Sequence, residues 1–498
     1  MPQHHATAPR GRELAPRSIF LEGRFGRLFR NLPSFAPDRS ALEPLAARML
    51  ESEGAGPEFD GEIPAGYTYL GQFIDHDITF DPVSSLQRQN DPDGLQDFRT
   101  PRLDLDSLYG DGPSNDPYLY DQSIDNGRTT FLLGQNANGE EDLPRNVLPP
   151  VNGIPQGRAL IGDPRNDENV IVGQLHLTFL RFHNMVVKRL TAEGFNAGPQ
   201  DPTVLDRLFE EAQRQVRWHY QWIVIKDFLP RICGEAVVND IFAPDSYETV
   251  GGTVSRPKVR LQFYRWQREP FMPVEFSVAA YRFGHSMIRP VYNLREGIGN
   301  IPIFTNGDLQ DEHTDLRGFR PLAREWTIDW SFFFGDGPNL QHARKIDTIL
   351  SAPLVKVPAT DEPHALALRN LERSSALALP SGQRVARAMG MEPMSDADLG
   401  IVELSEQFQE AAPLWFYVLK EAEAGGGTRL GPVGGRIVAE VLLGLIKGDP
   451  FSFVNVEPNW QPTLGASPGV FTMKDLVDFV GGAEPSAPPQ PSPGWPPQ

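Results

Sequence analysis

Hydrophobic residues recur with helical spacing in four long segments of the chain. These segments span residues 170–194, 206–234, 274–292 and 434–448, and in each the apolar positions follow one another at intervals of three and four. Runs that alternate between apolar and polar residues, as half-buried strands do, are few. The pattern predicts a mainly α fold with little β structure.

Proline content and composition set the expected domain organisation. The 47 prolines in 498 residues are nearly twice common usage and predict long loops between the helices. Because no repeat and no linker interrupts residues 35–480, we expect one large helical domain there. Residues 1–34 are rich in arginine, which favours an N-terminal arm packed on that domain, with a transit peptide as the alternative. Residues 481–498 are Pro-rich and poor in charge, which predicts a disordered tail or a ligand for a proline-reading domain.

Charge and cysteine content exclude several classes of protein. The formal net charge of −19 argues against binding of nucleic acid or of an anionic membrane. Cys233 is the only cysteine, so neither an intrachain disulfide nor a metal site of several thiolates is expected. The sequence has no long apolar run and no apolar signal-peptide core. We therefore expect no membrane span and a cytoplasmic protein, with export by another route left open.

Residues 71–77 (GQFIDHD) place three polar side chains on one helical face. Gln72, Asp75 and His76 are three and four residues apart, so an amide, a carboxylate and an imidazole point the same way. The flanking residues are too apolar and aromatic for a solvated charge run. The pattern predicts a pocket, and the alternative is a core histidine beside surface carboxylates.

A second histidine lies in an apolar segment with a cation beside it. His285 follows Arg282 by three residues, and Gly284 removes a side chain where a flat group could approach. Haem iron is commonly held by a histidine, and the forked guanidinium group suits a haem propionate. Such a histidine needs a partner for its other ring nitrogen, and Asn370 is able to accept that bond.

Two further clusters are weak signals by themselves. Arg165 and Glu168 are three residues apart where a long helix is expected to begin, which suits either a polar site or a surface ion pair. In residues 100–110 (TPRLDLDSLYG) the oxygen ligands that calcium prefers are closely spaced. They are the side chains of Thr100, Asp104 and Asp106 and the carbonyl of Arg102, with Asp77 able to complete the shell. A solvated acidic turn is the alternative.

These segments together resemble the animal-type haem peroxidase family of the peroxidase–cyclooxygenase superfamily. The resemblance extends in order from about residue 20 to 480. It also includes LTFLRFHNMVV, NLERSSALALPSGQRVARAMG and RLGPVGGRIVAEVLLGLIKGDPFSF. It implies a single helical haem peroxidase domain, and the lack of disulfides makes the chain more similar to the bacterial branch.

The resemblance implies haem b and calcium as cofactors and a role for each candidate residue. His76 corresponds to the distal histidine that moves the proton of hydrogen peroxide, and Arg165 to the arginine that polarises the breaking bond. Gln72 corresponds to the distal glutamine. The haem-binding positions are Asp75 and Glu168, which form haem esters in this family, His285 as the axial iron ligand, Asn370 as its acceptor, and Arg282 and Arg373 near the propionates. The calcium positions are Asp77, Thr100, Arg102, Asp104 and Asp106.

The chain also departs from the family pattern. Asn169 stands where myeloperoxidase has the methionine that bonds the haem vinyl, so neither a sulfonium link nor efficient chloride oxidation is expected. Asp106 replaces a serine of the cation loop. After Asn370 the common Ser-Arg-Asp-His-Gly run is replaced by Ser-Ser-Ala-Leu-Ala.

The expected function is a peroxidase that reduces hydrogen peroxide and oxidises phenols, iodide, bromide or thiocyanate. Fatty-acid dioxygenation is one alternative, but it needs a radical tyrosine three residues before the proximal histidine. Arg282 occupies that place, and Tyr281 is expected to point away from the haem. The alternative from another class is a non-catalytic, calcium-stabilised scaffold with a partner-binding Pro-rich tail. A metal phosphohydrolase built on His76 and Asp77 lacks further ligands at suitable spacing.

Overall fold

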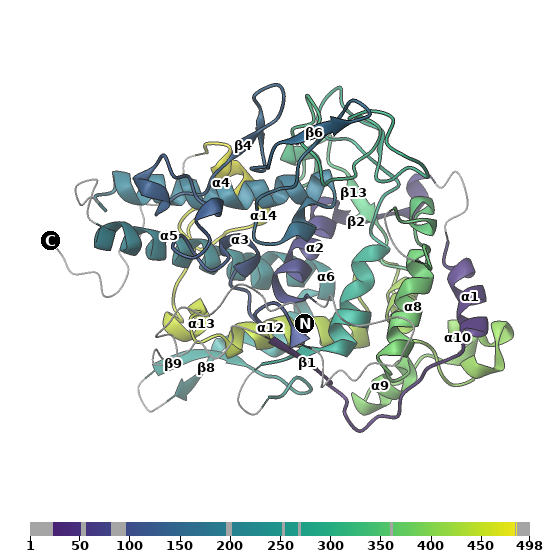
Figure 1. The fold of residues 1–498 in the computed structure, drawn as a ribbon. Coiled ribbons are helices and arrows are strands. Elements are labelled where there is room, and N and C mark those ends of the chain that lie inside the picture. Colours follow the sequence, from purple (N-terminus) through teal and green to yellow (C-terminus); the bar gives the residue numbers. More distant parts are fainter. Residues whose placement is uncertain are drawn as a thin grey trace.

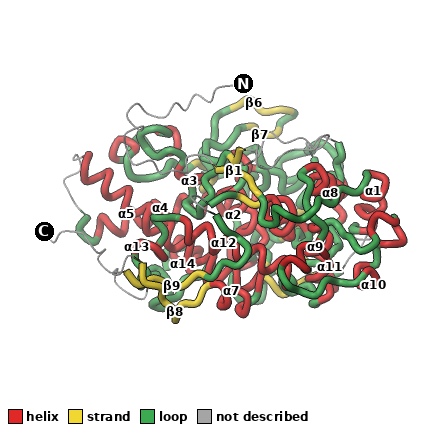
Figure 2. Tube along the Cα trace, turned by 90° about the horizontal axis from the view of Figure 1, so that it is seen from below, coloured by secondary structure: helices red, strands yellow, loops and turns green. Residues whose placement is uncertain are grey.

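Helices form most of the regular structure. The computed structural model describes residues 23–50, 56–80, 96–195, 202–250, 254–266, 270–358, 362–483 and 485. Helices make up 45% and strands 12%, which confirms the mainly α prediction (Figures 1 and 2). Among the described residues, none of the helices is long and apolar enough to cross a membrane. The first part of the expected arm and nearly all of the expected tail lie outside the described residues.

The α-helices range from single turns to more than six turns in length. They are α1 (Arg39–Arg48), α2 (Gly66–Ile78), α3 (Asp106–Tyr109), α4 (Val170–Ala192), α5 (Pro202–Ile223), α6 (Leu229–Cys233), α7 (Glu235–Ile241), α8 (Leu366–Ala376), α9 (Gly382–Ala388), α10 (Asp396–Leu399), α11 (Leu414–Ala424), α12 (Pro432–Gly448), α13 (Phe453–Val456) and α14 (Met473–Val480).

The strands are short and pair mostly in twos. They are β1 (Gly23–Gly26), β2 (Asp60–Pro64), β3 (Gln96–Asp97), β4 (Gly134–Gln135), β5 (Glu141–Asp142), β6 (Leu148–Val151), β7 (Ile154–Gln156), β8 (Phe242–Val250), β9 (Val254–Val259), β10 (Met272–Pro273), β11 (Val291–Tyr292), β12 (Ile301–Pro302) and β13 (His342–Arg344). β1 pairs with both β10 and β3, so the described end of the N-terminal arm joins the body.

Two predicted helices form as expected because their first turns carry good start signals. α4 begins after Asn169, whose Oδ1 accepts a hydrogen bond from the backbone N–H of Val172 at 2.9 Å. α12 begins with Pro432 in its first turn, where no backbone donor is lost. α4 is buried over most of its length and packs against α2 and α5 (Figure 1).

Two other predicted helices are interrupted. α5 ends at Ile223, and a π-helical turn over Val224–Phe228 leads into α6. The prediction of a helix over 274–292 is wrong, because that segment is a π-helical turn (Glu275–Ala279) followed by a 3-10 turn (Ala280–His285). In this second segment the buried carboxylate of Glu275 accepts the N–H groups of residues 28 and 29 at 3.0 and 3.1 Å, which joins the π-helical turn to the N-terminal arm.

Candidate functional site

One cavity of about 320 Å³ collects six of the predicted site residues from separate segments of the chain. They are Gln72, Asp75 and His76 of α2, Glu168 before α4, and Arg282 and His285 of the irregular turn. Apolar side chains such as Ile303, Phe304 and Val357 line the rest. Arg165 and Arg373 are not among the described residues that line this cavity.

His76 is the first of three side chains that contact one another in series. It is 6% exposed, and its Nδ1 lies 2.8 Å from Oδ1 of Asn166. The amide nitrogen of Asn166 lies 3.0 Å from Nδ1 of His176. In this orientation the amide oxygen accepts the proton of His76 Nδ1, which leaves Nε2 of His76 as a proton acceptor. Burial, assisted by Arg165, lowers the pKa of His76 to about 3, so the ring is a neutral base near pH 7.

Gln72 is fixed by a second chain of polar side chains. Its amide nitrogen donates to Oε1 of Glu168, and its oxygen accepts from Nδ2 of Asn169 at 3.2 Å. Burial raises the pKa of Glu168 to about 7. Asn169 thus caps α4 with its oxygen and orients Gln72 with its nitrogen.

The two carboxylates of the cavity are both shifted toward their neutral forms. Burial raises the pKa of Asp75, although Arg165 and Arg282 act in the opposite direction. Oδ1 of Asp75 accepts the hydroxyl of Thr79 at 3.1 Å, which anchors it to the end of α2.

Arg165 lies behind the cavity. Its Nη2 donates to the carbonyl oxygens of His76 and Thr79 at 2.9 and 2.6 Å and to Asp163 at 2.7 Å. Its guanidinium carbon lies 4.6 Å from the ring centroid of Phe80. Arg165 is therefore placed to hold the end of α2 and to act on His76 through its charge.

His285 is also paired with an asparagine, but there the amide nitrogen, and not the amide oxygen, faces the ring. Its Nδ1 lies 2.7 Å from the amide nitrogen of Asn370 on α8, and the amide oxygen accepts Nη1 of Arg282 at 3.1 Å. The predicted contact between His285 and Asn370 is present. Asn370 does not accept a hydrogen bond from His285 as predicted, because its amide oxygen accepts from Arg282 instead. Burial, followed by Arg282, lowers the pKa of His285 to about 3, so the imidazole is neutral, and with Nδ1 accepting from Asn370 its proton lies on Nε2. Arg373 lies one turn further along α8, partly buried.

Tyr281 corrects another expectation. It lines the cavity instead of pointing away, and it is 6% exposed. The expectation that Tyr281 points away presumes the residue spacing of an α-helix, whereas Ala280–His285 is a 3-10 turn. Among the described residues, its buried hydroxyl oxygen has no hydrogen-bond partner.

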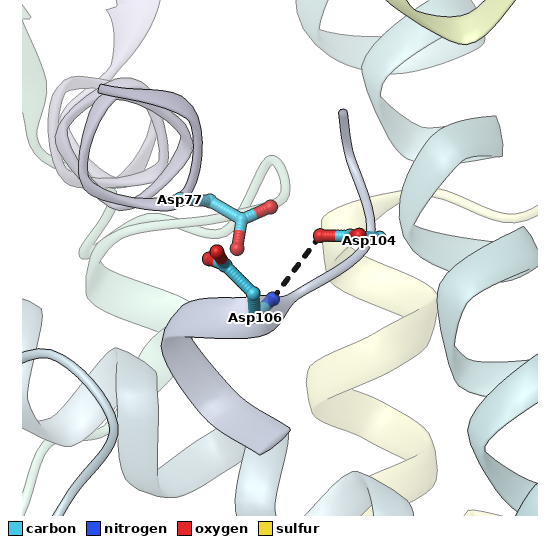
Figure 3. Close-up of side chains that lie close together, drawn as sticks. All are labelled: Asp77, Asp104 and Asp106. Atoms are coloured by element: carbon cyan, nitrogen blue, oxygen red, sulfur yellow. Dashed lines mark hydrogen bonds between the residues drawn. The ribbon is translucent and has the colours of Figure 1, made fainter. Parts of the chain in front are cut away.

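Three carboxylates meet beside the end of α2. Oxygen atoms of Asp77, Asp104 and Asp106 all lie within 4.8 Å of one another, and Figure 3 shows the side chains converging from α2, a loop and the start of α3. Leu105 has a φ of 60°, and this left-handed turn lets both of its neighbours face Asp77. Burial and Asp104 raise the pKa of Asp77 to about 7, and the pKa of Asp106 is raised as well.

The remaining predicted calcium positions surround this carboxylate cluster. The hydroxyl of Thr100 donates to Asp104 at 2.8 Å, and its backbone N–H donates to Asp106 at 3.1 Å. Arg102 is buried, and its backbone N–H donates to the carbonyl of Thr100 at 2.8 Å. The cluster has the hard oxygen donors and the concentrated negative charge that a calcium ion would satisfy.

The cavity fits a flat, iron-bearing group on three observations. Two neutral histidines line it, no residue beyond the chain neighbours of Gly284 lies within 4 Å of the point where a Cβ on that glycine would stand, and two carboxylates and Arg282 also line it. Nε2 of His285 is the ring nitrogen left for iron, and it becomes a ligand when the ring proton lies on Nδ1, which requires the amide oxygen of Asn370 to face that atom. The donor set therefore suits haem.

Several residues that hold the site together were not predicted from the sequence. Asn166 contacts His76, Asn169 contacts Gln72, and Asp163 contacts Arg165. All three lie in the GDPRNDEN segment, where adjacency to Arg165 and Glu168 was the available signal. The hydroxyl of Ser107 donates to Asp77 at 2.9 Å, and nothing in its spacing predicted this.

The chain is similar to known proteins in sequence and in fold. The sequence model of a family described as "Animal haem peroxidase" matches residues 87–461, which include Arg165, Glu168, His285 and Asn370. A peroxidase-like protein of Margaritifera margaritifera is 35% identical over 154 residues, 31% of this chain and 17% of its own length. The chain thus matches less than a fifth of that relative.

Two solved structures share the fold. Peroxidase A from Dictyostelium discoideum superposes with a TM-score of 0.62 at 17% identity and covers 93% of both chains. A fatty acid alpha-dioxygenase of Oryza sativa superposes with a TM-score of 0.59 at 14% identity, over 90% of this chain and 79% of that one. At these identities the likeness concerns the fold alone.

Proposed function

Because the chain belongs to the animal haem peroxidase family, whose members use haem, we propose that it is a haem-dependent peroxidase. It would reduce hydrogen peroxide and oxidise small donors such as phenols, iodide, bromide or thiocyanate. The observation that carries the proposal is one cavity lined by two neutral histidines from distant segments, each with an asparagine at Nδ1. His76 has Nε2 free to accept a proton, and His285 would bind iron through Nε2 once the oxygen of Asn370 faces its Nδ1.

In this proposal His76 is the general base and acid. Its Nε2 takes a proton from hydrogen peroxide and returns it to the departing oxygen, a role typically worth about 10² to 10⁴-fold in rate. Asn166 holds the ring in the tautomer that leaves Nε2 basic. Gln72 orients water or a halide beside it. Arg165 acts through its charge, which helps to keep His76 neutral.

The haem-binding residues have separate tasks. Haem, when bound, supplies the iron that binds peroxide oxygen and holds the oxidising equivalents. His285 would be its axial ligand, and Arg282 and Arg373 would pair with its propionates. If Arg282 turns to a propionate, the oxygen of Asn370 becomes able to accept the Nδ1 proton of His285. Asp75 and Glu168 would form the ester links.

Calcium would bind where the carboxylates converge. We propose Asp77, Asp104 and Asp106 as ligands, with the hydroxyl of Thr100 and the carbonyl of Arg102. An ion there neutralises buried charge and anchors the end of the helix that carries His76.

The test is a spectrum and a donor panel. Protein expressed with ample haem should show a strong Soret band of ferric haem and should oxidise phenols or iodide only when peroxide is added. Acid–solvent extraction should leave the haem attached if either ester forms. A protein that binds no haem would overturn the proposal and would leave the calcium-stabilised scaffold.

A second function is favoured by Tyr281. Its buried hydroxyl has no partner among the described residues and lines the same cavity as His285, and a dioxygenase shares the fold. Fatty-acid oxygenation therefore remains a candidate despite the spacing of four residues. Oxygen uptake with a long-chain fatty acid should then be lost in Tyr281→Phe, while peroxidase activity stays. No oxygen uptake by the unaltered protein would exclude it.

A further inference from the structure

Tyr67 of the cavity wall is linked to the protein surface by two charged side chains. It lines the cavity and is 3% exposed. Its hydroxyl donates to Oδ2 of Asp227 at 2.7 Å. Arg231 donates from Nε to Oδ1 of the same carboxylate at 2.8 Å, and the Arg231 side chain is 43% exposed. The three side chains thus extend from the cavity to solvent.

The Tyr67 ring lies close to the exposed end of this path. The guanidinium carbon of Arg231 is 4.7 Å from the ring centroid, and Phe334 packs edge-on at 5.3 Å. A donor that touches the exposed part of Arg231 is therefore separated from the phenol ring by one side chain. The cavity of about 320 Å³ is too small for bulky donors, whereas this surface is open to them.

Asp227 is well placed as a proton acceptor. It lies in the π-helical turn Val224–Phe228, a rare geometry found frequently at functional sites. It is 2% exposed along its side chain, and the backbone N–H of Met473 also donates to its Oδ2 at 2.9 Å. Burial and Asp227 raise the pKa of Tyr67 far above its usual value, so the phenol keeps its proton until an electron leaves.

We propose that Tyr67 is a redox-active residue through which phenolic donors too large for the cavity are oxidised at the surface beside Arg231. The inference rests on the proposed peroxidase function, in which hydrogen peroxide takes up two electrons and two protons and becomes two water molecules. Asp227 is the proton acceptor of the phenol.

Each one-electron step is balanced. Tyr67 gives one electron toward the cavity, and its phenolic proton moves to Oδ2 of Asp227, which leaves a neutral tyrosyl radical. The donor phenol then gives one electron to Tyr67 and releases its own proton to solvent. The proton on Asp227 returns to the Tyr67 oxygen, so both residues are restored while peroxide receives its electrons.

A pair of donors that differ only in size tests this. Tyramine and tyramine coupled to a large dextran carry the same phenol, and the haem-loaded protein should oxidise both. In Tyr67→Phe the rate with the dextran-bound donor should fall about tenfold or more relative to the rate with free tyramine. Asp227→Asn keeps an acceptor oxygen but is a far weaker base, and it should lower the same ratio. Tyr120→Phe, which removes a buried hydroxyl bonded to the carbonyl of Tyr109, is the control and should leave the ratio unchanged.

A second measurement does not depend on turnover. After peroxide is added, a nitroso spin trap should label residue 67, as mapped by peptide mass spectrometry, and the label should be absent in Tyr67→Phe. If Tyr67 only anchors α2 to the π-helical turn, its removal lowers thermal stability but leaves the rate ratio and the label pattern unchanged, and the inference is overturned.

The two proposals fail in different ways. A protein that oxidises free tyramine but not the dextran-bound donor contradicts the role of Tyr67 alone. A protein that oxidises neither contradicts the proposed function.

Discussion

Two histidine–asparagine pairs contribute to the same cavity, and they differ in what fixes them. On the side proposed as distal, His76 lies in the regular helix α2 and faces the amide oxygen of Asn166. On the side proposed as proximal, His285 ends a 3-10 turn and faces the amide nitrogen of Asn370. A third residue in each group decides which amide atom faces the histidine. His176 contacts the amide nitrogen of Asn166, and Arg282 donates to the amide oxygen of Asn370. With the oxygen of Asn166 facing it, His76 keeps Nε2 basic, whereas His285 carries its proton on Nε2 until the oxygen of Asn370 turns to its Nδ1.

The largest expected difference follows from removal of each ring. His285→Ala should lose the haem, because none of the other described residues lining that side of the cavity offers an axial nitrogen, and the Soret absorbance should fall to background. His76→Ala should keep the haem and slow its reaction with peroxide by about 10² to 10⁴-fold in stopped-flow measurements. If His76→Ala reacted at the unaltered rate, the distal assignment would be wrong.

Replacement of each asparagine by aspartate should change the pH dependence of the peroxide reaction for one pair and not for the other. With a His76 pKa of about 3, the peroxide reaction should be flat near neutrality and decline only as the pH falls through about 3, where the base is protonated. In Asn166→Asp the carboxylate favours the imidazolium, so this acid limb should move upward by about one to three pH units.

Asn370→Asp is the matched control on the proximal side. It should leave the acid limb in place and shift the ferric haem spectrum instead, because a carboxylate makes the His285 ring a stronger ligand. An equal shift of the acid limb in both variants would contradict the comparison.

Calcium removal should affect the distal side first. Asp77 follows His76 directly, and Arg99, which lies 3.6 Å from Asp106, also pairs with Asp163, the partner of Arg165. Chelation should lower the thermal midpoint by on the order of 5 °C and slow the peroxide reaction, without loss of the axial ligand.

Differential scanning calorimetry and the haem spectrum measure these effects of calcium. Asp104→Asn should mimic chelation, whereas Asp308→Asn, at an exposed aspartate outside the cluster, should not. Simultaneous loss of haem on chelation would show that the two sides are not separable.

The smallest expected effect concerns Asn169. Asn169→Asp keeps the helix cap but removes the N–H that holds Gln72, which is worth about 0.5 to 1.5 kcal/mol. Halide oxidation should fall about two- to tenfold with no change in thermal midpoint. Asn169→Ser also keeps a capping oxygen and should show the same loss of halide oxidation. Full halide oxidation in either variant would exclude a role of Asn169 in orienting Gln72.

The sequence specified the distal side better than the proximal side. Gln72, Asp75 and His76 share a helical face by spacing alone, and α2 realises it. The segment with His285 has equally helical spacing, yet it forms a π-helical turn and a 3-10 turn, and Glu275 within it bonds to the N-terminal arm. In this 3-10 turn the side chain of Tyr281 lines the cavity.

By itself the sequence determined which chemical groups are present and which neighbours share a face, because helical spacing is a local property of the backbone. It also predicted the mainly α fold and the carboxylates that gather around Asp77. Only the tertiary structure decided which amide atom faces each histidine, that Arg165 lies behind the cavity, and that Tyr67 is linked to Arg231. Each of these depends on contacts between residues far apart in the chain, and the orientation of an amide or a guanidinium group follows from such partners and not from its own position.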